Sequence, residues 1–384
     1  CRSFHVAAQS ILGWIALGMI MKQTQFQHLL QILSATAFTL MATYLHSEPI
    51  SYVGLQTLQT TEIAVTLVYP THAPSQTEHI GPFTVKVARD APPALTNNRL
   101  VVLSHGSGGS ATADHDLAAT LARAGFLVAQ PQHRGDNAQD HGQAGPESWK
   151  TRPNEIRQTI DALAQHTTWG KLFDAQRVGV HGMSAGGVSG LTLAGAQWQM
   201  LHFIQHCNAH WNEDLGFCAN GLAGQPKEQS IRKAQMLSVH LAPTESLLPA
   251  RLKTRHGGQE SVDPRPDPRI TAVTLVVPLA AIFTPESLAR IRLPVGLITA
   301  GKDGVLNPQF HSTYVLQHCL SCRVIYANQQ AGHFDWLSPW PAHIAQRLDK
   351  AQIRGGSPNA EFTNAQREAA WSNIARFFLQ NLNP

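Results

Sequence analysis

A serine between glycines, at the junction of an apolar strand and a helix, is the feature that most constrains the fold of this chain. The run Val178-Gly179-Val180-His181-Gly182-Met183-Ser184-Ala185-Gly186-Gly187 holds a G-x-S-x-G motif directly after an expected strand. In that setting the serine sits on a sharp turn, and the glycines leave room for the backbone to double back. The helix that follows adds the positive end of its dipole. We therefore interpret Ser184 as a nucleophile; a tight turn with an incidental serine is the simpler alternative.

Short apolar runs alternate with helical patterns on both sides of Ser184. We expect strands at residues 63–69, 83–87, 100–103, 126–130, 177–180, 272–277, 295–300 and 323–327, and helices at about 113–124, 153–165, after Ser184, near 310–318 and at about 364–379. Apolar runs this short are typical of buried parallel strands. The alternation predicts an α/β fold with a doubly wound, mostly parallel sheet flanked by helices.

The stretch from Ala196 to Ile270 interrupts this alternation. It holds its own pair of cysteines together with histidines, tryptophans and proline-rich turns. Open α/β sheets bind ligands at the carboxyl ends of their strands. We therefore expect a catalytic domain over residues 50–384, with residues 196–270 inserted as a lid over those strand ends.

The first 49 residues resemble a leader rather than part of this domain. Two apolar runs, residues 7–21 and 29–45, are separated by Lys22 and several glutamines, and neither is a clean membrane span. From Met21 onward, a lysine, an apolar stretch, small residues and Glu48-Pro49 follow the order of a secretory signal peptide. Residues 1–20 are then an upstream extension. A membrane anchor is the alternative, so membrane association is expected through this segment only.

The composition favours an exported protein. Charged residues make up 14% of the chain, where about 25% is typical, so the polar surface must use uncharged side chains and the 20 histidines. A hydrophobic content of 43% with a net charge of +4 excludes disorder as the main state. The positive charges form no block, which excludes a nucleic-acid partner. We expect a secreted or periplasmic protein, or a membrane-anchored one as the alternative.

Four of the five cysteines suggest two disulfides. Cys207 and Cys218 lie 11 positions apart, Cys319 and Cys322 form a C-x-x-C, and Cys1 stands alone. Pairing within each couple is the simplest of three connectivities, and the sequence leaves the other two open. A redox role for the C-x-x-C is disfavoured because Cys319 follows a helical pattern, whereas redox motifs open a helix after a strand.

Two residues after Ser184 are suited to complete a triad. A serine alcohol needs a base held by a third group, and in one known chain order the acid and then the base follow the nucleophile. Asp303 comes just after the expected strand 295–300, and His333 follows the strand 323–327 within Ala331-Gly332-His333-Phe334. We expect His333 to be the general base and Asp303 to orient it. Asp335 and Asp267 are the weaker candidates for the acid.

A glycine-rich loop is the candidate oxyanion hole. The run His105-Gly106-Ser107-Gly108-Gly109 ends the expected strand 100–103. We assign the oxyanion donors to the backbone N–H groups of Ser107 and Ala185. A phosphate-binding loop is the alternative, but no lysine follows as in a P-loop and no G-x-G-x-x-G is present.

With these motifs the chain resembles the α/β-hydrolase superfamily, in particular the dienelactone hydrolase-like esterases near the platelet-activating-factor acetylhydrolase and polyester hydrolase branches. The resemblance covers most of residues 62–339 and is carried by Tyr69-Pro70, residues 102–106, 154–163, 182–187 and 267–273, Asp303 and Gly332-His333-Phe334. Dienelactone hydrolases proper use a cysteine nucleophile, whereas this chain has Ser184. That departure favours a general carboxylic-ester substrate, and the resemblance implies no catalytic metal and no cofactor.

Two further groups of residues each have two interpretations. His202, His206 and His210 are spaced to share one helix face and could hold zinc, but histidines on a polar lid are more often solvated, and we expect no metal. Four tryptophans either line an acyl pocket or pack the lid, and the sequence weighs these evenly: Trp198, Trp211, Trp336 and Trp340.

These features together predict an exported serine carboxylic-ester hydrolase that works through an acyl-enzyme intermediate. Its substrate is a small-molecule, lipid or polymer ester, and the sequence does not say which. An amidase or peptidase of the same fold is the alternative within enzymes, since the same triad attacks amides. A non-catalytic binding protein of this fold is the alternative outside them.

Overall fold

The structure is a computed structural model, and it describes residues 52–94, 97–218 and 266–382. The chain divides into two units, residues 1–50 and residues 51–384. The expected leader and residues 219–265 of the expected lid lie outside the described residues, so the domain boundaries predicted from the sequence stay predictions.

The second unit is built on one ten-stranded sheet. Its strands follow the spatial order β10-β9-β8-β7-β5-β6-β2-β1-β4-β3. In chain order they are β1 (Tyr52–Gln59), β2 (Ala64–Thr71), β3 (Gln76–Ile80), β4 (Phe83–Arg89), β5 (Leu100–Ser104), β6 (Leu127–Pro131), β7 (Val178–Met183), β8 (Ile270–Val276), β9 (Val295–Ala300) and β10 (Cys322–Asn328).

The half of the sheet that carries the expected site is parallel. The strands from β6 through β5, β7, β8 and β9 to β10 all pair in parallel. Strand β2 is antiparallel to both β6 and β1, and β3 is antiparallel to β4. The mostly parallel, doubly wound sheet predicted from the sequence is therefore confirmed. In such a sheet the carboxyl ends of the central strands share one edge, and the loops after them meet there.

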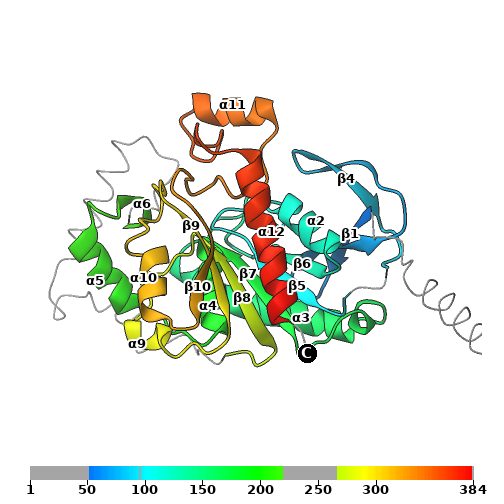
Figure 1. Cartoon of the computed structure of the whole chain (residues 1–384), viewed down its shortest axis with the longest axis horizontal. Helices are drawn as coiled ribbons and strands as arrows, with labels where there is room; N and C mark the ends of the chain where they lie inside the picture. Colours follow the sequence, from blue (N-terminus) through cyan, green and yellow to red (C-terminus); the bar gives the residue numbers. More distant parts are fainter. Residues whose placement is uncertain (1–51, 95–96, 219–265, 383–384) are drawn as a thin grey trace, which may run out of the picture. The chain divides into compact units, whose positions relative to one another are not determined.

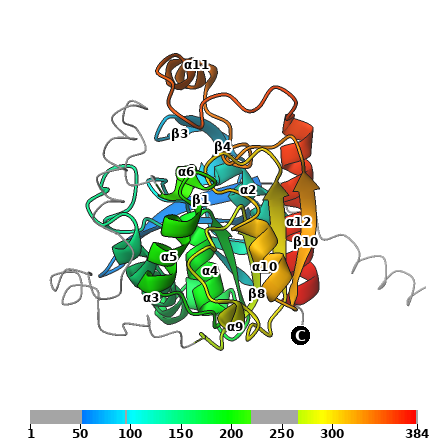
Figure 2. The same cartoon turned by 90° about the vertical axis from the view of Figure 1, so that its left-hand side faces the viewer.

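Helices cover both faces of the sheet (Figures 1 and 2). The buried side chains fall into two clusters, one containing residues of α2 and α12 and the other residues of α3 and α4. The helices are α2 (His115–Arg123), α3 (Pro146–Gln165), α4 (Ala185–Leu193), α5 (Met200–His210), α6 (Leu215–Cys218), α9 (Pro285–Leu288), α10 (Ser312–His318), α11 (Ala342–Lys350) and α12 (Asn364–Asn381), with a 3-10 turn at Trp169–Lys171.

Several elements differ from the sequence prediction. Helix α3 begins at Pro146 rather than at Pro153. The sequence prediction started the helix at Pro153 because proline is common in a first helical turn, but Pro146 takes that place and Pro153 lies inside the helix. Strands β1 and β3 and helix α11 were not expected. Four of the eight residues of β1 (YVGLQTLQ) are glycine, glutamine or threonine, and β3 (QTEHI) holds one large aliphatic residue, so neither gives a clear apolar signal.

The described part of the expected lid contains α5 and α6. A disulfide joins Cys207 of α5 to Cys218 of α6, with the Cα atoms 5.5 Å apart. A second joins Cys319 to Cys322 at the start of β10, with a Cα separation of 5.3 Å. The structure therefore pairs the cysteines within each couple. Over residues 52–94, 97–218 and 266–382, no helix combines the length and apolar character that a bilayer span needs.

Candidate active site

Ser184 lies on a strained turn between β7 and α4. Its backbone φ is 54°, in the left-handed region that residues with a side chain rarely adopt. The flanking glycines are required by close contacts: a Cβ at Gly182 would overlap the carbonyl oxygen of Gly186, and one at Gly186 would overlap that of Ser104. The strain holds the Ser184 hydroxyl at the carboxyl edge of the sheet, where the side chain stays half-buried.

The structure brings Ser184, His333 and Asp303 together from the carboxyl ends of three strands. His333 Nε2 lies 2.9 Å from Ser184 Oγ, and His333 Nδ1 lies 2.8 Å from Asp303 Oδ2. Because a carboxylate can only accept, Nδ1 carries the proton and Nε2 is free to accept from the serine hydroxyl. This is the arrangement in which an imidazole can take the serine proton.

The Asp303 side chain is fixed by its own loop. Its second oxygen, Oδ1, accepts hydrogen bonds from the N–H groups of Val305 and Leu306, both at 2.8 Å. The two weaker candidates for the acid are engaged elsewhere. Asp335 accepts from the N–H of Gly332, and Asp267 is paired with Arg269. Of these three carboxylates, only Asp303 orients His333.

The expected oxyanion loop lies against the nucleophile. A Cβ added at Gly106 would be 3.3 Å from Ser184 Cβ. Ser107 is held by its hydroxyl, which donates to Asp136 Oδ1 at 2.6 Å. Ala185 is the first residue of α4, where the N–H has no acceptor within the helix. The two residues chosen from the sequence therefore flank Ser184, and their role as oxyanion donors stays a prediction.

A buried ion pair that was not expected from the sequence supports this loop. Arg152 of α3 donates from Nη2 to Asp136 Oδ2 at 2.7 Å, and neither side chain is exposed. Arg152 also donates to the carbonyl oxygens of His105 and Gly106. Burial would raise the pKa of Asp136, but Arg152 and hydrogen bonds from Ser107 Oγ, Ser148 Oγ and Gly108 N–H lower it below its ordinary value. The ionised pair thereby holds the backbone from which the oxyanion donor would come.

A second set of serine, histidine and carboxylate, Ser104, His133 and Glu155, is joined by hydrogen bonds next to the glycine-rich loop. His133 Nε2 is 2.7 Å from Ser104 Oγ, and its Nδ1 is 2.7 Å from Glu155 Oε2. These distances match those around Ser184, yet Ser104 and His133 are 0% exposed and Glu155 is 2% exposed. Burial holds the pKa of His133 well below its ordinary value, and the charge of Arg152 lowers it further. This set is inaccessible to substrate and serves to join β5, the loop after β6 and α3.

A third cluster joins the described part of the expected lid to the Asp303 loop. Asp214, between α5 and α6, accepts from His206 Nε2 at 2.8 Å and from His311 Nε2 at 2.9 Å. Its other oxygen accepts from the N–H of Asn307 at 3.0 Å. Burial would raise the pKa of Asp214, but the hydrogen bonds from the two histidines outweigh it and hold the pKa well below its usual range. A Cβ at Gly216 would come within 2.6 Å of the Gly304 carbonyl oxygen, so the two segments are in close contact.

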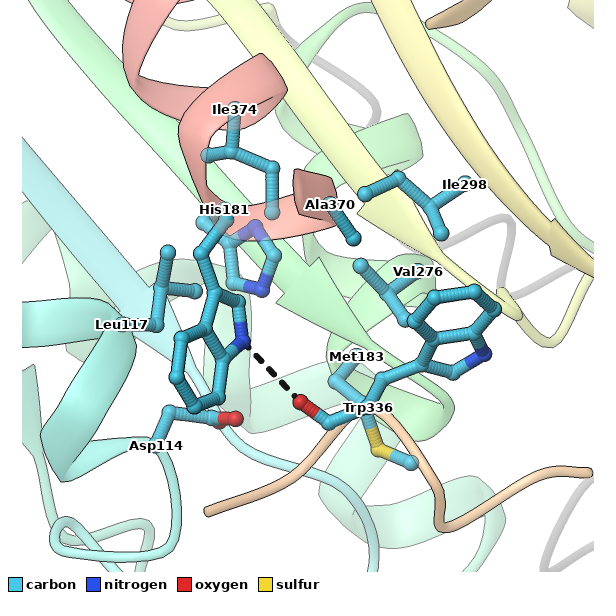
Figure 3. A pocket seen from close by; sticks show the side chains of 10 residues that line it. Asp114, Leu117, His181, Met183, Val276, Ile298, Trp336, Ala370 and Ile374 are labelled. Carbon is cyan, nitrogen blue, oxygen red and sulfur yellow. Dashed lines mark hydrogen bonds between the residues drawn. The ribbon is translucent and has the colours of Figure 1, made fainter. Parts of the chain in front are cut away.

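A small cavity lies behind the nucleophile strand (Figure 3). It measures about 10 Å³ and is lined by Asp114, His181 and Trp336 among others, a volume sufficient for one water molecule. Asp114 is 5% exposed, and burial raises its pKa to about 7. Burial also lowers the pKa of His181 to about 3, while its Nδ1 bonds to Thr274 Oγ1 at 2.9 Å. His181 is therefore neutral near pH 7, and Asp114 is protonated below about pH 7.

The histidines and tryptophans weighed from the sequence have defined places. His206 and His210 bond to Asp214 and Glu213, and the described residues contain no cluster of metal-ligating side chains. Trp198 and Trp336 are 2% and 3% exposed. Trp340 stacks on Phe83 with ring centroids 5.0 Å apart. These three tryptophans pack the core and the strand edges, and Trp211 packs partly buried against the core.

Comparisons with known proteins agree with this geometry. The prolyl oligopeptidase family matches residues 113–203, a segment that runs from just before α2 into α5 and includes Ser184. Among solved structures, a ferulic acid esterase from Streptomyces cinnamoneus is similar, with a TM-score of 0.54 and 16% sequence identity over 88% of this chain and 91% of that chain. No curated protein matches the chain.

The chain therefore has the α/β-hydrolase fold that the sequence predicted. The family match covers less than half of the chain, and the likeness to the esterase bears on the fold alone. Neither bears on the dienelactone hydrolase-like subtype, which stays a prediction.

Proposed function

We propose that this chain is an exported serine esterase that hydrolyses carboxylic esters through an acyl-enzyme intermediate. The observation that carries the proposal is the line of hydrogen bonds from Ser184 Oγ through His333 to Asp303, with distances of 2.9 and 2.8 Å. The strained φ of Ser184 and its partial exposure support it, because a nucleophile must be both held and reachable.

In the proposed reaction, Ser184 Oγ attacks the ester carbonyl carbon as His333 Nε2 takes the hydroxyl proton. The N–H groups of Ser107 and Ala185 donate hydrogen bonds to the carbonyl oxygen as negative charge develops on it. The C–O bond to the alcohol breaks, and the alcohol leaves with the proton from His333. Water then attacks the acyl-enzyme, giving its proton to His333, and Ser184 recovers that proton as the acid is released. Asp303 stabilises the imidazolium that forms in each half.

The substrate is proposed to be a small-molecule, lipid or polymer ester. Export is supported by the two disulfides, which form and persist in oxidising compartments. We propose a secreted or periplasmic location, or a membrane-anchored one, with membrane contact limited to the N-terminal segment. No cofactor and no nucleic-acid partner enter the proposal.

A labelling and substitution experiment tests the role of Ser184. A fluorophosphonate probe should modify Ser184 in the full chain, and Ser184→Ala should lower kcat/KM for p-nitrophenyl butyrate by at least ~10³-fold. Ser104→Ala is the matched control, since Ser104 has the same hydrogen-bond geometry but is inaccessible. Unchanged hydrolysis by Ser184→Ala would refute the proposal. Ligand binding without turnover of any substrate would favour a non-catalytic binding protein.

A peptidase or amidase is the second candidate, favoured by the match of residues 113–203 to the prolyl oligopeptidase family. Esters and p-nitroanilides that share one acyl group separate the two. Higher kcat/KM on the ester, beyond the ratio of the uncatalysed rates, supports an esterase. The reverse order supports a peptidase. A series of esters graded by acyl length and solubility then distinguishes small-ester from lipid or polymer substrates.

A further inference from the structure

A second cavity lies between α2 and the strands β1, β2 and β4. Its volume is about 240 Å³, larger than the ~150 Å³ cavity that is known to take benzene. None of the three residues Ser184, His333 and Asp303 lines this cavity. A molecule with an aromatic ring or a short alkyl chain therefore fits here, separate from the substrate at Ser184.

The strand side of this cavity combines aliphatic residues with polar ones from β2, β4 and β6, and the helix side is also mixed. Five aliphatic residues of the lining are each at most 8% exposed: Val53, Leu55, Val68, Ile80 and Val87. On the helix side, His115, Asp116, Ala119 and Arg123 share one face of α2, and Thr112 lies just before the helix. Such a combination of apolar surface with a few polar groups is typical of ligand sites.

One polar side chain in the lining, Gln130, forms no hydrogen bond within the described residues. Gln130 of β6 is 3% exposed, and it follows Val128 by two positions, so both side chains lie on the α2 face of the sheet. No hydrogen bond between described residues involves the side-chain amide of Gln130, whereas the neighbouring Gln132 accepts from the N–H of Ala111. The Gln130 amide therefore lines the cavity and is available to bond to a ligand there.

The charges around the cavity favour an anion. Arg123 lies in the last turn of α2, and Lys86 lies on β4; among the described residues neither forms an ion pair. Asp116 is the single carboxylate of the lining, and it is 3.5 Å from His115 Nε2. Arg123 is separated from Asp116 by two turns of α2. Its guanidinium is therefore available to a negatively charged ligand at the rim.

We propose that this cavity binds a small monocarboxylate with an apolar body. The body packs on Val53, Leu55 and Val68, and the carboxylate accepts an N–H of the Gln130 amide, with its charge offset by Arg123. The proposal does not depend on the reaction at Ser184, because the cavity and its polar groups are separate from the triad.

Titration of the full chain with sodium 3-phenylpropanoate, followed by calorimetry, tests the proposal. We expect saturable binding, with Kd raised about tenfold by Gln130→Leu and by Arg123→Gln, since each removes one charge-assisted contact. Arg347→Gln is the matched control, because Arg347 also lies in the last turn of an exposed helix and should leave Kd unchanged. The neutral 3-phenylpropan-1-ol should bind at least about tenfold more weakly than the carboxylate.

A cavity-filling variant tests the same site independently of Gln130→Leu, which could fail to fold. Ala119→Leu adds aliphatic volume from the α2 side and should abolish 3-phenylpropanoate binding while ester hydrolysis stays within about twofold of wild type. No saturable binding up to about 10 mM would overturn the proposal. Equal affinity in wild type, Gln130→Leu and Ala119→Leu would also overturn it, because the ligand would then bind elsewhere, for example at Ser184.

Discussion

Replacing Arg152 by methionine tests how the glycine-rich loop beside Ser184 is held. Arg152 and Asp136 form an ion pair with both side chains fully buried. The same guanidinium donates to backbone carbonyls of His105, Gly106 and Asp136. Arg152→Met keeps an unbranched apolar stem but removes the guanidinium, its charge and all of these donors. The change therefore leaves the Asp136 carboxylate buried without its cation.

The size of the effect follows from that uncompensated charge. Removing one partner of a buried ion pair costs ~3–5 kcal/mol, so the free energy of unfolding should fall by that amount and Tm by roughly 10 °C. The remaining hydrogen bonds from Ser107, Ser148 and Gly108 still stabilise the Asp136 carboxylate in part. We also expect kcat to fall about 10- to 100-fold with a smaller change in KM, because the loop that carries the proposed oxyanion donor is displaced.

The effect also has a defined pH dependence. The folded-state pKa of Asp136 is lowered, so the pair contributes fully above the pKa of ~3.9 in the unfolded chain. That contribution is lost as the pH falls through the lower folded-state value. The difference in stability between wild type and Arg152→Met should therefore be constant near neutral pH and become smaller in acid.

Urea unfolding followed by tryptophan fluorescence, together with kinetics on p-nitrophenyl butyrate, measures both effects. Arg157→Met is the matched control on the same helix: Arg157 is partly exposed and 3.8 Å from Asp267, so its loss should cost less than ~1 kcal/mol. The double variant Asp136→Asn/Arg152→Met should be more stable than the sum of the single changes predicts. Simple additivity, or a cost below ~1 kcal/mol for Arg152→Met, would refute the reasoning.

Three further substitutions have defined outcomes. Ser104→Ala should keep kcat/KM within about threefold while unfolding becomes easier by ~1–3 kcal/mol, because it leaves buried His133 Nε2 unpaired; a hundredfold loss of activity would contradict our interpretation of that set. Asp214→Ala should lower kcat for esters about tenfold with little change in KM, since it removes the oxygen that accepts from the N–H of Asn307 in the Asp303 loop. An unchanged kcat would show that this contact does not position the loop. Asp114→Asn should match wild type in stability below about pH 4 and exceed it by up to ~4 kcal/mol above pH 7. Folding raises the pKa of Asp114 from 3.8 to about 7, so as the pH rises Asp114 ionises first in the unfolded chain, which destabilises the folded wild type. Urea titrations between about pH 4 and 8 measure this difference, and one that does not vary with pH would contradict it.

The parts of the site that could be predicted from the sequence depend on local geometry. Ser184 was found because a strand, a glycine-flanked serine and a helix are contiguous in the chain. Asp303 and His333 were found because each follows a predicted strand, and parallel strands bring their carboxyl ends to one edge. In the structure His333 lies within hydrogen-bond distance of Ser184 and Asp303 within that of His333, and their catalytic roles stay predictions. These predictions required only the order of the elements, and errors of one or two residues at strand ends did not affect them.

The supporting network could not be predicted in the same way, because it depends on how α3 packs. The sequence placed the start of that helix at Pro153, which left Arg152 outside it. In the structure, Arg152 and Glu155 fall on the same buried face as Ile156, Ile160 and Leu163. A signal was present: charged residues that continue the apolar stripe of a helix must be paired if that face is buried. Their partners, Asp136 and His133, are on a loop whose course the sequence pattern does not define.

The two serine, histidine and carboxylate sets show which criterion separates a candidate nucleophile from a structural hydrogen-bond network. Their distances are nearly equal, so hydrogen-bond geometry alone would select either Ser104 or Ser184. Ser104 is the last residue of the regular strand β5, where it is the register partner of Gly182 in β7. Its side chain is fully buried. Ser184 has a left-handed φ and a partly exposed side chain. The glycines that create this turn are visible in the sequence, and for that reason the motif identified the accessible serine although the second set was unknown.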